Sequence, residues 1–365
     1  MVLKNLWRRK TRTSLTVVGI AIGIAVVVAL LLLAEGLTGQ LNNLMAGGGA
    51  EVSLIQKGIA DMSFSALDEE VGLAIAEMPD VQWVSGLLVQ VGPVGQKSFF
   101  VTLGLDPDPE TLRHFRMVEG EMLKADGEMM LGRMAADFFG KGPGDVLTIQ
   151  GRSLRVAGVY ETGVGFEDAG GVISLAEAQQ LFKKPDQVSF YQVKLRPEAL
   201  GRIDALIQEI EQRFPDVVGY RSSEFARNTP DIQTFQALAG AISFIGLLAG
   251  ALGTMNTMLM SVFERTREIG TLRALGWRKR RVIAMILGES LTLSLIGGLA
   301  GVALGVGLAL FVGTIPAVSG YFVPRLSVSS IATGVSVALT LGALGGLYPA
   351  WRAARLQPVE ALRYE

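Results

Sequence analysis

Four long runs without a charged residue constrain this 365-residue chain more than any other feature. They cover residues 13–34, 232–263, 290–324 and 326–351. A helix needs roughly 20 apolar residues to cross the core of a bilayer, so each run is long enough to span it. The third helix is expected to begin near Val282. The sequence therefore predicts an integral membrane protein with four transmembrane α-helices.

The first run could also be a secretory signal peptide. Its apolar part is longer than the roughly 7–15 residues of a signal core, and no small-x-small cleavage site clearly follows, so we interpret it as a retained helix. The expected segments are a cytoplasmic basic N-terminus (1–12), helix one (13–36), an extracytoplasmic domain (37–231), helix two (232–263), a cytoplasmic helix and basic loop (264–281), helix three (282–312), a short outer loop (313–325), helix four (326–351) and a cytoplasmic C-terminus (352–365).

Lysine and arginine are concentrated in three of the segments that flank the helices. Five lie within residues 1–12, seven within 264–281 and three within 352–365, whereas the loop 313–325 holds only Arg325. Short basic loops remain in the cytoplasm. We therefore expect both termini and residues 264–281 on the inner side of a cytoplasmic membrane.

This orientation places the long segment between helices one and two outside the cell membrane. Gly36–Asp231 contain 17 Lys and Arg against 28 Asp and Glu, a formal charge of −11. Such a surface repels phosphates, which argues against nucleic acid as a ligand. The chain has no cysteine, which excludes disulfides and zinc–thiolate sites.

The outer segment alternates short β-rich runs with amphipathic helices. Helical spacing covers residues 68–78, 175–182 and 202–214. Residues 145–162 have the pattern of a β-hairpin with its turn at Gly151–Arg152. The sequence therefore predicts a large α+β domain inserted between helices one and two.

Motifs that would support catalysis are weak. The fragments nearest to a nucleotide-binding loop, Gly95–Ser98 and Gly140–Gly142, lack the required spacing and are expected to be turns. The single histidine, His114, has no second histidine or cysteine with which to share a metal, so we expect a solvent-facing or packed helix residue. We expect no enzyme activity and no cofactor in this chain.

The apolar runs contain glycines spaced one helical turn apart. In lipid, this spacing lets helices approach closely through their backbones, either within one chain or between two copies. The glycines concerned are Gly19, Gly23, Gly246, Gly250, Gly297, Gly301 and Gly305.

Glu289 is the one ionisable residue that lies well inside an expected span. A carboxylate at the centre of a membrane helix costs at least ~2.5 kcal/mol on insertion scales, so it needs a partner or a watery cavity. One interpretation is an intramembrane coupling contact. The other is a carboxylate that reaches the inner headgroup region near Arg280 or Arg281.

The segment 264–281 leaves the bilayer, remains basic and re-enters it. Ile269, Leu272 and Leu275 recur at three-residue spacing, which predicts a short helix with a narrow apolar stripe that ends at Gly276. A positive-inside anchor or a helix lying on anionic lipid would explain the arginines.

Two glutamates in this segment favour a third interpretation, a helix that docks on another protein. Glu264 and Glu268 would be repelled by anionic lipid, whereas a protein partner accommodates mixed charge beside an apolar stripe. The pattern therefore favours a docking helix.

"ERTREIGTLRALG", at 264–276, resembles the signature of the MacB/FtsX-like permeases, which are membrane subunits of ABC transporters. The same resemblance appears at 14–31, in "SLTVVGIAIGIAVVVALL", and at 348–365, in "YPAWRAARLQPVEALRYE". Residues 131–160 are similar to the extracytoplasmic core of that family.

The resemblance implies a homodimer, or a pair of such chains, in the lipid bilayer, bound to two ABC ATPase subunits that hold ATP and Mg. No ATPase domain precedes helix one, so the ATPase is expected to be a separate chain. The helix seated on it is implied to use Glu264, Arg265, Arg267, Glu268, Ile269, Leu272, Leu275 and Gly276.

The expected function is export of a hydrophobic or amphiphilic substrate, such as a drug, peptide, lipid or lipoprotein. ATP-driven movement of the ATPase pair would pass through the docking helix and helices one and two to the outer domain. The alternative is an FtsX-like mechanotransducer that activates an extracytoplasmic hydrolase without transport. The size of the outer domain favours transport, and a periplasmic adaptor is a further candidate partner.

Overall fold

The computed structural model describes residues 10–59, 62–107, 109–228 and 230–357. The chain divides into two compact units. The helical unit falls within residues 1–33, 237–310 and 326–365, and the α+β unit within residues 34–236 and 311–325. The expected cytoplasmic N-terminus, 1–12, lies largely outside the described residues, and so does much of the C-terminal segment.

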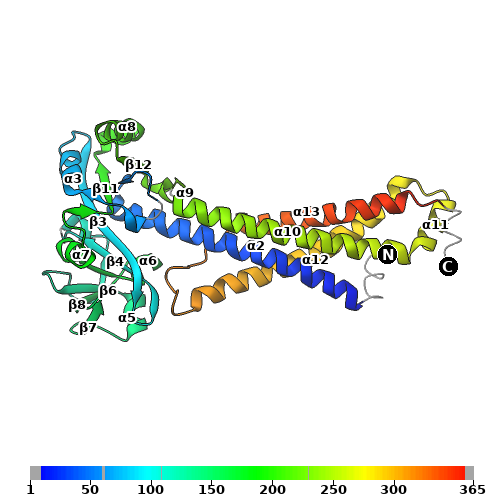
Figure 1. Ribbon diagram of the computed structural model, residues 1–365, viewed down its shortest axis with the longest axis horizontal. Coiled ribbons are helices and arrows are strands. Elements are labelled where there is room, and N and C mark those ends of the chain that lie inside the picture. Colours follow the sequence, from blue (N-terminus) through cyan, green and yellow to red (C-terminus); the bar gives the residue numbers. More distant parts are fainter. Residues whose placement is uncertain (1–9, 60–61, 108, 229, 358–365) are drawn as a thin grey trace. The chain divides into compact units, whose positions relative to one another are not determined.

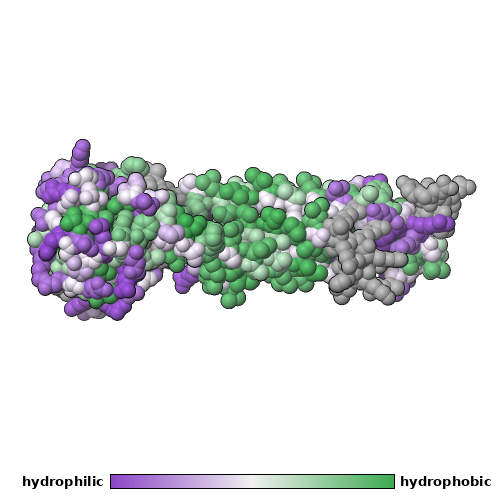
Figure 2. All heavy atoms as spheres, turned by 90° about the horizontal axis from the view of Figure 1, so that it is seen from below, coloured by the Kyte–Doolittle hydropathy of each residue, from purple (hydrophilic) through white to green (hydrophobic). Residues whose placement is uncertain are grey.

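Within the described ranges, four helices are long and apolar enough to cross a membrane, which confirms the predicted architecture (Figure 1). They are α2 (Lys10–Met45), α10 (Pro230–Glu264), α12 (Lys279–Thr314) and α13 (Val328–Ala354). In Figure 2, apolar side chains cover most of the visible surface of these helices. Such a surface fits a lipid environment. The short helix α11 (Thr266–Ala274) follows α10.

Three of the glycines singled out above lie where α12 meets α2. A Cβ atom added at Gly297, Gly301 or Gly305 would lie 2.9, 2.7 or 2.7 Å from the nearest atom of α2. No ordinary side chain fits at these separations, so the glycines allow the two backbones to approach. A Cβ at Gly23 or Gly250 would make ordinary contacts at 3.5 and 3.6 Å.

Gly19 and Gly246 behave differently, because a Cβ at either would meet no atom within 4 Å among the described residues.

A further contact joins α12 to α13, where the Ser290 hydroxyl donates to the Gly342 carbonyl at 2.7 Å. Hydroxyl-to-carbonyl bonds of this kind are common between helices in membranes.

The α+β unit contains a mixed sheet that, among the described residues, has ten strands in the order β12-β1-β11-β3-β4-β9-β6-β8-β5, with β7 paired to β8. The pairs β4–β9 and β6–β8 are parallel, and the other pairs are antiparallel. The strands are β1 (Val52–Gln56), β3 (Val81–Val94), β4 (Lys97–Leu105), β5 (Arg116–Gly120), β6 (Glu128–Gly132), β7 (Val146–Ile149), β8 (Arg152–Glu161), β9 (Gly171–Ser174), β11 (Phe190–Leu195) and β12 (Val217–Arg221). The short strands β2 (Leu67–Asp68) and β10 (Gln187–Val188) pair separately.

The sheet buries both faces, as the alternation of side chains along its strands shows. In β3, Leu88 belongs to one buried cluster, whereas Leu87 and Val89 belong to the other. This is the period of two expected for a strand covered on both sides. The second cluster includes Leu37 and Leu44, so the end of α2 contributes to the core of the α+β unit.

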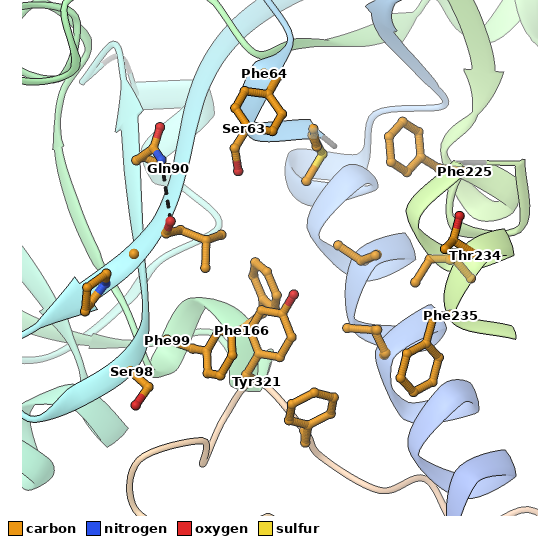
Figure 3. Close-up of a pocket in the computed structure, with 18 of the residues that line it drawn as sticks. Ser63, Phe64, Gln90, Ser98, Phe99, Phe166, Phe225, Thr234, Phe235 and Tyr321 are labelled. Carbon is orange, nitrogen blue, oxygen red and sulfur yellow. Dashed lines mark hydrogen bonds between the residues drawn. The ribbon is translucent and has the colours of Figure 1, made fainter. Parts of the chain in front are cut away.

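Three predicted helices of the outer segment are confirmed as α3 (Glu69–Ala76), α7 (Leu175–Phe182) and α8 (Ile203–Arg213). The shorter helices are α4 (Pro109–Leu112), α5 (Arg133–Phe139), α6 (Gly165–Asp168) and α9 (Phe225–Asn228), together with the 3-10 turns η2 (Gly47–Gly49), η3 (Met62–Phe64), η4 (Pro197–Arg202) and η5 (Ser222–Glu224). A cavity within the α+β unit is lined by β3, β4 and the ends of α2 and α10 (Figure 3).

The predicted hairpin is present, but its turn lies one residue earlier than expected. Arg152 already pairs with Ile149 as the first residue of β8, so the turn consists of Gln150 and Gly151. Both have positive φ, at 47° and 85°. Two-residue hairpin turns favour this geometry because it matches the twist of the strands.

Candidate functional site

The strongest candidate site is α11, the short helix between α10 and α12. The junction before it is stabilised by Thr266, whose hydroxyl donates to the carbonyls of Val262 and Phe263, at the end of α10, at 3.1 and 2.8 Å. Its end is stabilised by Gly276, whose φ of 92° favours glycine and whose N–H donates to the Arg273 carbonyl. The predicted helix and its stop at Gly276 are confirmed.

One face of α11 is buried in the helical unit. Ile269 is 1% exposed and belongs to a buried cluster with Val262 of α10 and Val282 of α12. Ile269 therefore does not lie on the exposed face of α11, because its side chain packs inside the helical unit and anchors α11 to its own chain. The apolar stripe is divided between two environments.

The opposite face of α11 is available to a partner. Leu275 is 75% exposed, Arg267 and Glu268 are exposed, and Leu272 is half-buried. Glu264, the last residue of α10, is also exposed. This face therefore combines an exposed leucine with charges of both signs.

Arg265 links this face to the interior of the helical unit. Its guanidinium donates to Glu268 Oε2 and to Glu289 Oε2, each at 3.0 Å. Glu289 is 8% exposed and lies on α12. The sequence left open a coupling contact or a carboxylate that reaches the headgroup region near Arg280 or Arg281. In the structure, the Glu289 carboxylate pairs with Arg265, the residue that follows α10.

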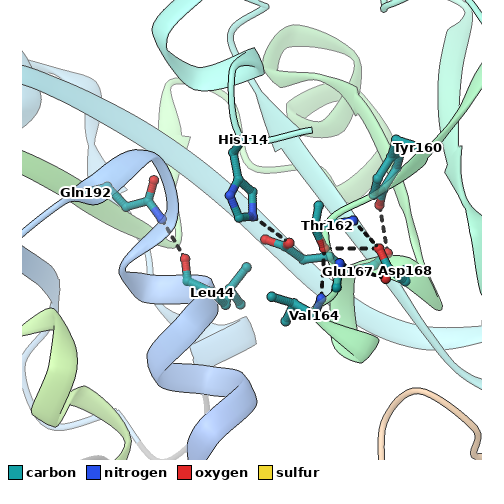
Figure 4. A network of polar contacts seen from close by, with 9 residues as sticks. Leu44, His114, Tyr160, Thr162, Val164, Glu167, Asp168 and Gln192 are labelled. Carbon is teal, nitrogen blue, oxygen red and sulfur yellow. Dashed lines mark hydrogen bonds and ion pairs between the residues drawn. The ribbon is translucent and has the colours of Figure 1, made fainter. Parts of the chain in front are cut away.

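A second group of polar residues lies inside the α+β unit (Figure 4). His114 Nε2 is 2.7 Å from Glu167 Oε2, and Glu167 is 2% exposed. The hydrogen bond with Glu167 raises the pKa of His114, and burial opposes this rise. His114 lies in a turn after α4, so the expected helical position is wrong. The Tyr160 hydroxyl donates to the Glu167 carbonyl at 2.7 Å.

The same network shapes the chain on either side of α6. Asp168 accepts hydrogen bonds from the backbone N–H groups of Thr162 and Gly163 at 2.7 and 3.1 Å. Figure 4 also shows Gln192 of β11 donating to the Leu44 carbonyl, which holds the end of α2 against the sheet. In each of these contacts the polar group has its hydrogen-bond partner within the chain, which indicates a structural role.

Other residues considered above take ordinary structural positions. Gly95 and Gly140 adopt positive φ in turns, as predicted. Over the described part of the chain, no group of three or more histidine and acidic side chains is arranged to hold a metal ion.

Lys97, beside the first of these turns, is fully buried. It donates to the Ser319 carbonyl at 3.3 Å, and burial lowers its pKa. The sequence offered no local signal for this residue, and none for the pairing of Arg265 with Glu289.

Comparisons with known proteins identify the family of this chain. The family described as the MacB-like periplasmic core domain matches residues 13–213, and the FtsX-like permease C-terminal family matches residues 240–358. The chain therefore belongs to the MacB/FtsX-like family of ABC transporter permeases. With its four apolar helices, this makes it a protein of the bacterial inner membrane.

Several curated relatives are similar over nearly all of this chain. The pyoverdine export ATP-binding/permease protein PvdT of Pseudomonas savastanoi is 30% identical, with 99% of this chain and 58% of that protein covered. The macrolide export ATP-binding/permease protein MacB of Bdellovibrio bacteriovorus is 28% identical, with 99% and 61% covered. This chain thus spans about three fifths of their length. The ABC transporter permease YknZ of Bacillus subtilis is 28% identical, with 100% and 98% covered.

Proposed function

We propose that this chain is the permease subunit of an ABC exporter and that it carries ATP-driven movement of separate ATPase subunits to the α+β unit. ATP and Mg would be held by those subunits. Membership of the family supports the role of an ABC transporter permease. The names of two relatives, which refer to macrolide and pyoverdine export, support a hydrophobic or amphiphilic substrate.

The observation that carries the proposal is the geometry of α11. The helix presents Leu275 and Glu268 outward, while Ile269 and the Arg265–Glu289 ion pair fasten it to α10 and α12. A load applied to the exposed face is therefore transferred to two long helices. A mere surface anchor would not require a buried ion pair, which is costly unless well matched.

Two long helices extend beyond the apolar spans. Residues 34–45 of α2 and 230–236 of α10 are assigned to the α+β unit, while the rest of each helix belongs to the helical unit. A continuous helix transmits displacement along its axis, because its backbone hydrogen bonds resist stretching. We infer that α2 and α10 are the transmitting elements.

We also propose that α10 pairs with a second copy, because it is the least buried of the four candidate spans. Phe244, Ile245 and Leu252 are 61%, 66% and 59% exposed. Two ATPase subunits and two such chains would complete the assembly. The termini and α11 would then lie in the cytoplasm and the α+β unit outside, in agreement with the basic flanks.

The test is to purify the tagged chain from its native membrane in mild detergent, identify the co-purified ATPase by mass spectrometry, and measure its hydrolysis of ATP. Glu268→Arg should abolish the stimulation of the ATPase while membrane insertion stays normal, because the reversed charge opposes docking. Normal stimulation in this variant would overturn the docking role of α11.

The matched control is Glu198→Arg, the same charge reversal at an exposed position of the α+β unit. It should leave stimulation unchanged. A chain that is purified without any ATPase would overturn the proposal altogether. Co-purification of an extracytoplasmic hydrolase that the complex activates would replace export with regulation.

A further inference from the structure

The α+β unit contains a cavity of about 1010 Å³, and every residue that lines it belongs to that unit. Its walls come from β3 and β4, the end of α2, the start of α10 and the loop 311–325 (Figure 3). This volume is at the upper end of the range of roughly 300–1,000 Å³ that is typical of sites for small molecules. The size alone does not define a ligand, but the composition of the walls does.

One wall is a cluster of aromatic rings. The ring of Tyr321 lies 4.8 Å from that of Phe99, 5.0 Å from that of Phe166 and 5.0 Å from that of Phe322. Figure 3 shows Phe225 and Phe235 on the opposite side of the space. Aromatic faces offer large apolar contact with little loss of side-chain entropy, which suits a ring-containing ligand.

This aromatic wall is held in place by buried polar contacts. The Gln40 amide of α2 donates to the Tyr321 carbonyl at 3.1 Å, and Lys97 of β4 donates to the Ser319 carbonyl at 3.3 Å. Both contacts fix the loop 311–325 against the rest of the unit. A site whose wall is already positioned binds a ligand at lower entropic cost.

The charges around the cavity limit what it can hold. Among the described lining residues the only charged side chain is Lys184, whose ammonium donates to the carbonyls of Ser63 and Ser65 at 2.6 and 3.1 Å. The remaining polar lining groups, such as Ser98 and Thr234, are neutral. An anion would also be repelled by the strongly acidic domain.

We propose that this cavity is a binding site for an uncharged, largely apolar small molecule that carries an aromatic or similar ring. The inference rests on the proposed export function and identifies where such a cargo is held. Three observations support it: the aromatic wall, the fixed loop 311–325, and the fact that Lys184, the one charged side chain among the described lining residues, already donates to carbonyls of the chain. Gly92 of β3, which lines the cavity, provides a way to fill it.

The experiment is photolabelling of the full chain in lipid nanodiscs with a neutral trifluoromethyl-phenyl diazirine, followed by mapping of labelled peptides by mass spectrometry. Label is expected around Phe99, Phe166 and Tyr321, in addition to the lipid-facing helices. A Cβ at Gly92 meets no atom within 4 Å, so the first atom of a side chain there is free of clashes, and we choose Gly92→Trp to fill part of the cavity. We expect this variant to lose about tenfold of the cavity labelling, equivalent to about 1.4 kcal/mol of binding.

The matched control is Gly142→Trp, at a glycine that also has no atom within 4 Å of an added Cβ but does not line the cavity. It should label like the original chain, and labelling of α10, α12 and α13 should be the same in all three proteins. The same diazirine bearing a carboxylate should label the cavity poorly.

Three results would overturn the proposal. They are label confined to the membrane helices, equal cavity labelling in Gly92→Trp and the original chain, and equal cavity labelling by the anionic probe. The experiment needs neither ATP nor an ATPase. If labelling fails but Glu268→Arg abolishes ATPase stimulation as expected, the cavity is not a binding site and the proposed function stands. If labelling succeeds but Glu268→Arg has no effect, only the coupling role of α11 is rejected.

Discussion

Arg265 holds two carboxylates of different exposure, and the difference predicts the effect of removing each. Glu289 is largely buried, with 10% of its side chain exposed, whereas Glu268 is 67% exposed. Removing one member of a buried pair leaves an uncompensated charge, but an exposed ion pair is screened by water. Arg265 should therefore contribute to stability mainly through Glu289.

We predict that Glu289→Gln destabilises the purified chain by about 1–3 kcal/mol and weakens stimulation of the ATPase, because the neutral amide holds Arg265 less firmly. Thermal unfolding in detergent measures the first effect. Glu268→Gln is the control, with an expected loss of about 0–1 kcal/mol. Equal losses from the two variants would contradict a buried coupling contact.

His114 predicts a pH dependence of stability. Its pKa is raised in the folded chain, mainly by the hydrogen bond with Glu167. The stabilisation is therefore fully present below the unfolded pKa of about 6.5 and is lost as the pH rises through the higher folded pKa. The temperature of unfolding should fall over this window as the pH rises.

The measurement compares the original chain with His114→Gln between about pH 6 and pH 9, which brackets the ordinary histidine value. Glutamine keeps a donor for the buried Glu167 at every pH, so the variant should lack the component of the slope that histidine contributes. At low pH the variant should be less stable than the original chain by at most about 1.5–3 kcal/mol, the range for a hydrogen bond to a charged group. Identical pH profiles would show that this histidine does not titrate in that window.

At the scale of secondary structure, α12 depends on glycine where it meets α2. We predict that Gly301→Val destabilises the helical unit by about 1–3 kcal/mol, the usual cost of overpacking, because a Cβ there would lie 2.7 Å from an α2 carbonyl oxygen. Gly307→Val is the matched control on the same helix, since a Cβ at Gly307 meets no atom within 4 Å.

Both substitutions make the same change in helix propensity, so their difference in thermal stability isolates packing. A comparable loss in the two variants would indicate that the close approach of α12 and α2 is not what Gly301 provides.

At the scale of the whole molecule, the orientation in the membrane is the feature to test. The chain has no cysteine, so single-cysteine variants report one position each. In spheroplasts, Ser153→Cys in β8 should react with a membrane-impermeant maleimide, whereas Thr271→Cys in α11 should react only after permeabilisation. Both positions are exposed in the structure. The opposite pattern would invert the topology expected from the basic flanks.

The elements that depend on local pattern were predictable. The four spans, the hairpin and the three amphipathic helices each follow from periodicity or from an apolar run within a short stretch of chain. The environment of a side chain was not predictable where it depends on contacts with residues far away in the chain. The three-residue spacing indicated an apolar stripe on α11, but only the packing of α10 and α12 determines that Ile269 is buried and Leu275 exposed.

The sequence by itself determined that this chain is a membrane protein with four spans, basic flanking segments and an acidic α+β insertion, because apolar length and charge distribution are properties of contiguous residues. The tertiary structure alone decided that Arg265 pairs with Glu289 and that Phe99, Phe166 and Tyr321 form one wall. These residues are far apart in the chain and lie together only because the folded helices and strands bring them into contact. No local pattern encodes such contacts, since each depends on the path of the whole chain.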